Sequence, residues 1–320
     1  MRRRTFLALA GAATLPFAAR AQRARKTKRI GFLRAGEPPS SFIEPFRAGL
    51  RELGYIEGRD IEIVYGLPKT VEELNDAAAE LVRLNVDVLV ASGTPSVAPA
   101  KKATDVIPVV FIAAIDPVAI KVANSLAQPG GNVTGLTAVF ADLTGKRLEL
   151  MRELVPNLSR VVLLSRTANP GHHQYVREGE RAAQQLQIEL VTLTVEGAND
   201  FEAAFQRARG ASAILQIDDA LFTSHGSTLV ALATQHGLPG IYGTREFVTS
   251  GGLVALGPSY ADLYHRAAGY VDKVFRGESP GDLPIQQPSK FELVINLKTA
   301  KALGLTVPAT LLARADELIE

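Results

Sequence analysis

The stretch that decides the fold is VDVLVASGTPSVAPAKKATDVIPVVFIAAIDPVAI, residues Val86–Ile120. It contains two apolar runs, Val86–Ala91 and Val109–Ala113, which are typical of buried strands, and an alanine-rich helical segment between them. The first run ends in the polar turn Ser92–Ser96, and the second is followed by Asp116–Pro117. A strand, a helix and a second strand in this order predict a parallel sheet that is covered by helices on both faces.

The same alternation continues on both sides of this stretch. Strands are expected at 29–33 and 61–65 before it, and a second series of strands begins at residue 160. The strands of this second series are expected at 160–164, 188–193, 213–217 and 240–242. Two such series of domain size predict an α/β protein with two doubly wound parallel-sheet lobes that are joined by a hinge.

The first residues of the chain differ in composition from the rest. Arg2–Arg4 precede an apolar stretch that ends at Ala18, and Ala19–Ala21 supplies the small residues that signal peptidase requires. We therefore expect residues 1–21 to be a cleaved signal peptide. The run Arg3–Leu7 resembles the twin-arginine pattern, which would mean export of a folded protein, and the general export pathway is the alternative. The apolar stretch is shorter than the roughly 20 residues of a spanning helix.

The positive charge of the chain is concentrated at this end. Residues 1–29 carry nine of the 35 basic residues and none of the 33 acidic ones, so residues 30–320 have a net charge of −7. Residues 22–29 are expected to form a basic, flexible flank. Because the remaining body is acidic, we expect no nucleic-acid partner. The absence of cysteine excludes disulfides, thiolate metal sites and a cysteine nucleophile.

Polar stretches follow most of the expected strands. In open parallel sheets, ligands bind beyond the carboxyl ends of the strands. If the two lobes face each other, these stretches all line one cleft, which predicts a binding site for a small molecule. The six stretches are 34–41, 92–96, 114–117, 165–169, 218–219 and 243–246.

The turn Ser92–Ser96 is the best candidate for binding an anion. Ser92, Thr94 and Ser96 place three hydroxyls beside the backbone N–H groups of a helix N-terminus, which suits an α-carboxylate. An ordinary N-cap, which needs only one of these hydroxyls, is the alternative.

Carboxylates follow two of the strands. Asp218 and Asp219 come directly after an apolar strand, where a carboxylate must be solvated or paired. A ligand ammonium would supply that partner, and we predict that Asp218 binds it, whereas Asp219 could cap the next helix. Asp116 precedes Pro117 and fits a turn as well as a ligand contact.

Further candidates occupy the remaining strand ends. Arg34 and Arg166 follow the first strand of each lobe, and either could bind a carboxylate with two hydrogen bonds or lie in solvent. Phe140 and Tyr242 could stack on an aromatic ligand or pack in the core. Glu246 completes the set of ligand-binding candidates at these ends.

We expect no metal site and no cofactor. His172 and His173 are adjacent, and no Asp, Glu or Cys completes a ligand set at metal-site spacing. Phosphate-binding, dinucleotide-binding and hydrolase glycine motifs are absent from the sequence. An exported α/β enzyme that uses Asp116 and Asp218 as acid and base is the alternative class, and it would lack a nucleophile or a cofactor loop.

The C-terminal segment KVFRGESPGDLPIQQPSKFELVINLKTAKALGLTVPATLLARADELIE (273–320) resembles the signature of a bacterial family of ABC-transporter substrate-binding proteins. FRAGLRELGYIEGRDIEI (46–63) and IPVVFIAAIDPVAIKVANSLAQPGGNVTGL (107–136) resemble recurring segments of the same family. The resemblance implies a type I periplasmic-binding fold, a small-molecule ligand such as an amino acid, aromatic in some members, and a membrane permease and an ATPase as partners. Asn169 resembles an asparagine of the family's ligand-binding loop.

The resemblance also implies a location and a mechanism. Some relatives carry a lipidated cysteine after the signal, whereas this chain has none, which implies a freely diffusing periplasmic protein. We expect a monomer that closes its lobes on the ligand. The N-terminal lobe is expected to comprise 30–140 and 259–287, and the C-terminal lobe 141–258 and 288–320. A ligand-sensing protein without a transport role is the alternative use of the same cleft.

Overall fold

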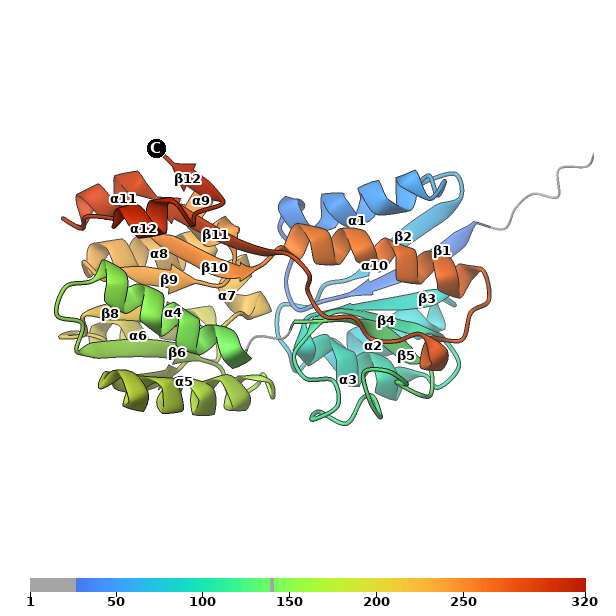
Figure 1. The fold of residues 1–320 in the computed structure, drawn as a ribbon. Helices are drawn as coiled ribbons and strands as arrows, with labels where there is room; N and C mark the ends of the chain where they lie inside the picture. The colour runs from blue at the N-terminus through green and yellow to red at the C-terminus, as the bar shows by residue number, and fades with distance from the viewer. Residues whose placement is uncertain (1–26, 139–140) are drawn as a thin grey trace, which may run out of the picture.

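The computed structural model describes residues 27–138 and 141–320 of the chain. The chain forms two α/β lobes that lie side by side and are connected by three segments (Figure 1). The expected signal peptide, residues 22–26 of the flank and the candidate Phe140 lie outside the described residues.

The first lobe is built on a five-stranded parallel sheet with the order β2-β1-β3-β4-β5. Helices cover both faces, so its central strands are apolar and buried along their whole length. The strands are β1 (Lys28–Leu33), β2 (Ile61–Gly66), β3 (Val88–Ser92), β4 (Val109–Ala114) and β5 (Val133–Thr137). Helices α1 (Ser40–Glu52) and α10 (Tyr260–Phe275) pack together on one face, and α2 (Leu74–Arg83) and α3 (Thr94–Ala103) pack on the other.

The second lobe contains a seven-stranded sheet with the order β12-β11-β10-β9-β8-β6-β7. Its strands are β6 (Arg160–Ser165), β7 (Glu189–Thr194), β8 (Ala213–Gln216), β9 (Gly240–Tyr242), β10 (Val254–Pro258), β11 (Phe291–Asn296) and β12 (Glu317–Ile319). Its helices are α4 (Ala141–Leu154), α5 (His172–Leu186), α6 (Phe201–Arg207), α7 (Ala220–Ser224), α8 (Gly226–Gln235), α9 (Arg245–Thr249), α11 (Leu297–Ala302) and α12 (Ala309–Leu312). The predicted class of two doubly wound α/β lobes is confirmed.

One strand of the second sheet departs from the expected parallel arrangement. Strand β11 runs antiparallel to β10, and Phe291 lies opposite Pro258. The chain leaves the second lobe at the end of β10 and comes back from the first lobe at the same edge of the sheet. It can therefore re-enter that sheet only in the opposite direction.

The chain passes between the lobes three times. The first passage connects β5 to α4, and the second connects β10 to α10, which packs on α1 in the first lobe. Before the third passage, Gln286 is hydrogen-bonded to both Gly135 and Thr137 at the edge of the first sheet. Neither lobe is therefore formed by one continuous piece of chain.

Lys28 and Arg29, which were expected in the flexible flank, belong instead to β1. The backbone N–H of Arg29 donates to the Asp87 carboxylate at 2.7 Å, and its guanidinium pairs with Glu62 at 2.8 Å. These acidic partners lie 33 and 58 residues away along the chain. A local count of charge in residues 22–29 could not indicate them.

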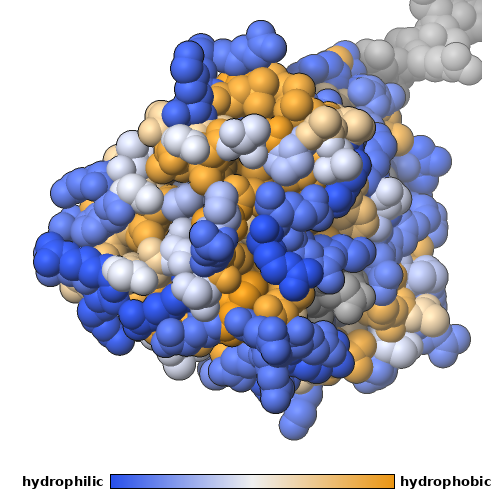
Figure 2. Space-filling model, turned by 60° about the vertical axis from the view of Figure 1, so that its left-hand side comes forward, coloured by the Kyte–Doolittle hydropathy of each residue, from blue (hydrophilic) through white to orange (hydrophobic). Residues whose placement is uncertain are grey.

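Seen from the side of the second lobe, hydrophilic residues cover much of the surface, with apolar residues between them (Figure 2). Across residues 27–138 and 141–320, none of the helices combines the length and the apolar character that crossing a membrane requires. The same residues form no group of three or more His, Cys, Asp or Glu side chains that could hold a metal ion.

Asn132 joins three parts of the first lobe just before β5. Its side-chain amide donates to the carbonyl oxygens of Thr104 at 2.9 Å and Ile107 at 2.8 Å, and Asn132 is only 8% exposed. Because Asn132→Ala would leave these carbonyls without the amide donor, we expect it to lower the free energy of unfolding by about 1–3 kcal/mol. Urea denaturation measures this change. The exposed neighbour Gln128 is the matched control, and an equal loss in Gln128→Ala would contradict the explanation.

Candidate functional site

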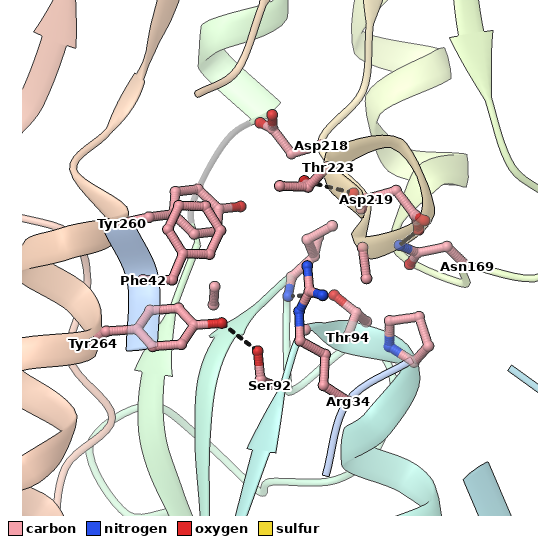
Figure 3. A pocket seen from close by; sticks show the side chains of 15 residues that line it. Arg34, Phe42, Ser92, Thr94, Asn169, Asp218, Asp219, Thr223, Tyr260 and Tyr264 are labelled. Carbon is pink, nitrogen blue, oxygen red and sulfur yellow. Dashed lines mark hydrogen bonds between the residues drawn. The ribbon is translucent and has the colours of Figure 1, made fainter. Parts of the chain in front are cut away.

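A cavity lies where the lobes meet, at the carboxyl ends of their strands. The first lobe contributes residues from the ends of β1, β3 and β4 and from α1, α3 and α10. The second lobe contributes the loop before α5 and the segment from Asp218 to Thr223 (Figure 3). Five predicted residues line this cavity: Arg34, Ser92, Thr94, Asn169 and Asp218.

Only one of the two carboxylate oxygens of Asp218 has a hydrogen-bond partner among the described residues. Its Oδ2 accepts a hydrogen bond from Arg147 at 3.0 Å, and both side chains are almost completely buried. Its Oδ1 is also buried and has no hydrogen-bond partner among residues 27–138 and 141–320. The carboxylate packs so closely on Gly243 that a Cβ there would lie 1.5 Å from Oδ1. Asp218 lines the cavity, and a cation bound there would compensate the negative charge of this buried carboxylate.

Asp219, in contrast, has all its partners within the protein. Its carboxylate accepts hydrogen bonds from Asn169 Nδ2 at 2.7 Å and from the backbone N–H of Leu221 at 2.7 Å, so it caps α7. Arg166 Nη1 lies 3.4 Å from the same carboxylate. Arg166 is therefore a buried partner of Asp219 and does not line the cavity.

His172 lies next to this network and is neutral. Its Nδ1 accepts a hydrogen bond from the backbone N–H of Arg166 at 2.8 Å, and its Nε2 lies 3.3 Å from the carbonyl oxygen of Asp218. These contacts fit the tautomer that carries the proton on Nε2. Burial lowers the pKa of His172 below its usual value of 6.5.

We expect the protein to lose stability as the pH falls below 6.5, because the unfolded chain then binds a proton at His172 that the folded protein does not bind. The free energy of unfolding, measured with urea at pH 7.5 and 5.5, should decrease less in His172→Gln than in the wild type. Equal decreases in the two proteins would show that another group causes the dependence.

The three hydroxyls of the turn Ser92–Ser96 have different roles. Ser92 Oγ is hydrogen-bonded to the hydroxyl of Tyr264, and Thr94 Oγ1 accepts from the backbone N–H of Ile115 at 2.9 Å. Ser96 Oγ donates to the carbonyl of Ser92 at 3.0 Å and does not line the cavity. Among the described residues no side chain caps α3. Pro95 has no N–H and the Ser96 N–H donates to the carbonyl of Gly93, so the backbone N–H and the hydroxyl of Thr94 are the groups that can receive an anion here.

Three aromatic residues that sequence reasoning missed form one wall of the cavity. Phe42 of α1 stacks on Tyr260 at 4.7 Å between ring centroids, and its ring lies 5.2 Å from that of Tyr264. Both tyrosines come from the first turns of α10. This helix follows β10 of the second lobe in the chain but packs on α1 of the first lobe. Their separation by four residues, which places both on one helix face, was the available signal.

Other predicted residues lie outside this cavity. The ring of Tyr242 is buried in the second lobe, where it stacks on Phe247 and lines a different cavity. Asp116 accepts a hydrogen bond from the backbone N–H of Ala119 at 2.9 Å, which fits the turn alternative. Glu246 accepts a hydrogen bond from Ser41 of the first lobe at 2.6 Å and so connects the two lobes.

A second polar contact joins the lobes beside the cavity. Ser224 Oγ of α7 lies 3.4 Å from Arg34 Nη1 and 3.3 Å from the carbonyl oxygen of Glu37. Together with the bond between Ser41 and Glu246, this contact links the two lobes directly.

The sequence and the fold match a known family. Residues 40–319 match the family of ABC transporter substrate binding proteins. A tyrosine-binding protein of Clostridioides difficile (strain R20291) is 28% identical over 285 residues, which are 88% of this chain and 82% of that protein.

Two solved structures are similar over 92% of this chain and 100% of their own chains. One is a conserved domain protein from Vibrio cholerae, with 29% identity and a TM-score of 0.86. The other is the ABC domain from Streptococcus pneumoniae in complex with L-Trp, with 25% identity and a TM-score of 0.84. The fold is that of type I periplasmic binding proteins. The chain therefore belongs to the family of ABC transporter substrate binding proteins.

Proposed function

We propose that this protein binds an aromatic amino acid between its lobes and delivers it to the permease of an ABC importer. The observation that carries the proposal is the buried carboxylate of Asp218, which lines the cavity between the lobes and has one oxygen without a partner among the described residues. A ligand ammonium would pair with it and compensate its burial. The tyrosine-binding relative and the structure with L-Trp support the aromatic class.

The opposite side of the cavity is suited to the ligand carboxylate. At the N-terminus of α3, Thr94 offers its backbone N–H and its hydroxyl as donors. Phe42 and Tyr260 then lie against the carbon atoms next to the charged groups of the ligand. The cationic and anionic ends of an amino acid would thus contact different lobes, because Asp218 belongs to the second lobe and Thr94 to the first.

A ligand held by both lobes favours the closed arrangement, and its binding free energy shifts the balance between open and closed forms. The contacts of Ser41 with Glu246 and of Arg34 with Ser224 are made in the closed form. We infer that the permease and the ATPase recognise this form, as the family implies. The export expected from residues 1–21 supports a periplasmic location.

The experiment is a binding screen on the chain that begins at Gln22, after it has been unfolded and refolded to remove bound solute. Melting temperatures are recorded with the twenty amino acids and with small carboxylates, amides and sugars. A ligand at a hundredfold excess over its Kd stabilises the folded protein by about 2.7 kcal/mol. We expect stabilisation by L-tyrosine or L-tryptophan and none by their N-acetyl or methyl-ester derivatives. Stabilisation by neither amino acid would refute the proposal, and chemical conversion of the bound ligand would favour the enzyme alternative.

A further inference from the structure

A second cavity lies between the lobes next to the first, and Ile115 lines both. The second cavity has a volume of about 260 Å³, whereas the first has about 30 Å³. The first lobe supplies most of its wall, and α5 supplies the rest. The residues that matter here are Ile115, Pro117, Thr137, Ala138, Gln174 and Tyr175.

The wall of this second cavity is mainly apolar, but Thr137 adds a buried hydroxyl to it. Thr137 is 1% exposed, and its Oγ1 has no hydrogen-bond partner in the part of the chain that the structure describes. The backbone N–H of Thr137 is already used, since it donates to Gln286. A buried hydroxyl without a partner is unfavourable, and a polar atom on a bound molecule would satisfy it.

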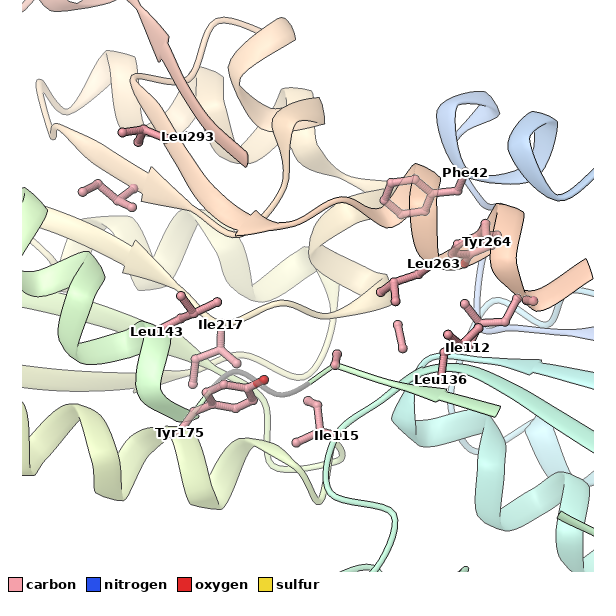
Figure 4. Packing of buried hydrophobic residues seen from close by; sticks show 14 of the residues in the cluster. Phe42, Ile112, Ile115, Leu136, Leu143, Tyr175, Ile217, Leu263, Tyr264 and Leu293 are labelled. Atoms are coloured by element: carbon pink, nitrogen blue, oxygen red, sulfur yellow. The ribbon is translucent and has the colours of Figure 1, made fainter. Parts of the chain in front are cut away.

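Tyr175 lines the second cavity, and in Figure 4 it lies close to Ile115 of the opposite lobe, the residue that lines both cavities. Burial raises the pKa of Tyr175 well above its usual value, and the negative charge of Asp218 raises it further. A molecule whose ammonium contacts Asp218 can extend past Ile115 and Tyr175 into the second cavity.

We infer that the second cavity holds the side chain of the amino acid while the first holds its ammonium and carboxylate, and that Thr137 selects rings carrying a hydrogen-bonding group. This inference rests on the proposed function. The small volume of the first cavity leaves no room for an aromatic ring, whereas the larger, apolar one suits it. The ligand class is therefore an amino acid with a phenol or indole side chain, in preference to phenylalanine.

Two substitutions test the inference by isothermal titration calorimetry with L-tyrosine, L-tryptophan and L-phenylalanine. Thr137→Val keeps the shape of the side chain and removes the hydroxyl. We expect it to lower the affinity for the preferred ligand, tyrosine or tryptophan, roughly fivefold, which corresponds to one net hydrogen bond. The affinity for phenylalanine should not change. Thr194→Val, at an exposed site on β7, is the matched control. Ala138→Leu fills the cavity and should weaken all three ligands at least tenfold.

The outcomes are distinct. If Thr137→Val changes the affinity for all three ligands equally, or for none of them, Thr137 does not select the ring. Unchanged affinity in a folded Ala138→Leu variant overturns the placement of the side chain. If Ala138→Leu fails to fold, Thr137→Val decides alone, because it introduces no extra volume. If the wild type binds no amino acid, the proposed function fails and the inference fails with it.

Discussion

Asp218→Asn is expected to weaken binding of the amino-acid ligand at least 30-fold. The substitution keeps the size of the side chain but removes the negative charge that pairs with the ligand ammonium. Removing one partner of a buried, hydrogen-bonded charge pair costs about 2–5 kcal/mol, which corresponds to a loss of roughly 30- to 5,000-fold in affinity. Calorimetric titration of the wild type and the variant with the same ligand measures this loss.

The same substitution has a second effect that must be separated from the first. Arg147 is buried against Asp218 and would lose its anionic partner, so the melting temperature should also fall. Binding is therefore measured well below the melting temperature of the variant. Asp76→Asn, on the exposed face of α2, removes a carboxylate without touching the cleft and should bind as the wild type does. Normal affinity in a folded Asp218→Asn variant would contradict the assignment of Asp218.

Gly171→Ala is expected to weaken ligand binding at least tenfold by preventing closure of the lobes. Gly171 lies at the start of α5, and a Cβ there would lie 2.7 to 2.9 Å from three carbon atoms of Ile115 in the other lobe. Carbon atoms that close repel each other, so the lobes would have to remain apart or Ile115 would have to move. The φ of Gly171 is −68°, which alanine adopts without strain. The stability of each separate lobe should therefore be retained.

Small-angle X-ray scattering with and without ligand measures the closure directly. We expect the radius of gyration of the wild type to decrease when ligand is added and that of Gly171→Ala to decrease less. Gly269→Ala is the matched control, because a Cβ at this position of α10 meets no atom within 4 Å. Wild-type affinity and wild-type compaction in Gly171→Ala would show that the contact with Ile115 does not limit closure.

The sequence predicts the two-lobed fold because its strands are apolar runs separated by helices, a pattern that is local in the chain. The reversed direction of β11 was not predictable in this way. It depends on the three passages between the lobes, which bring Phe291 to the edge of β10. The fold class is thus encoded in short windows, whereas the direction of one edge strand is a property of the whole chain.

Sequence reasoning also predicted part of the cavity wall. The rule that ligands bind at the carboxyl ends of strands leads to Ser92, Thr94 and Asp218, which all line the cavity. The same rule suggested Tyr242, whose side chain is directed into the core on the outer face of the second sheet. Successive side chains of a strand point to opposite faces, so position along the chain alone does not decide which of them reaches a cleft.

Two contributions to the site do not follow from the strand-end rule. Tyr260 belongs to residues 259–287, which were expected in the N-terminal lobe, but its ring was not predicted in the cavity wall. Arg147 pairs with an aspartate 71 residues away. In each case the partner is chosen by packing between segments that are distant in the chain. Only the folded protein brings them together.

The return of α10 to the first lobe also determines when this protein can fold during its synthesis. The apolar face of α1, with Phe42 and Phe46, is covered by α10, which the ribosome makes more than 200 residues after α1 has ended. Until then the nascent first lobe exposes this face, and such sequence-distant contacts make folding slow. If the chain is exported unfolded, this delay favours export, because the N-terminal half cannot fold completely before translocation begins. A chain exported folded must instead be released almost complete before it can pass the membrane.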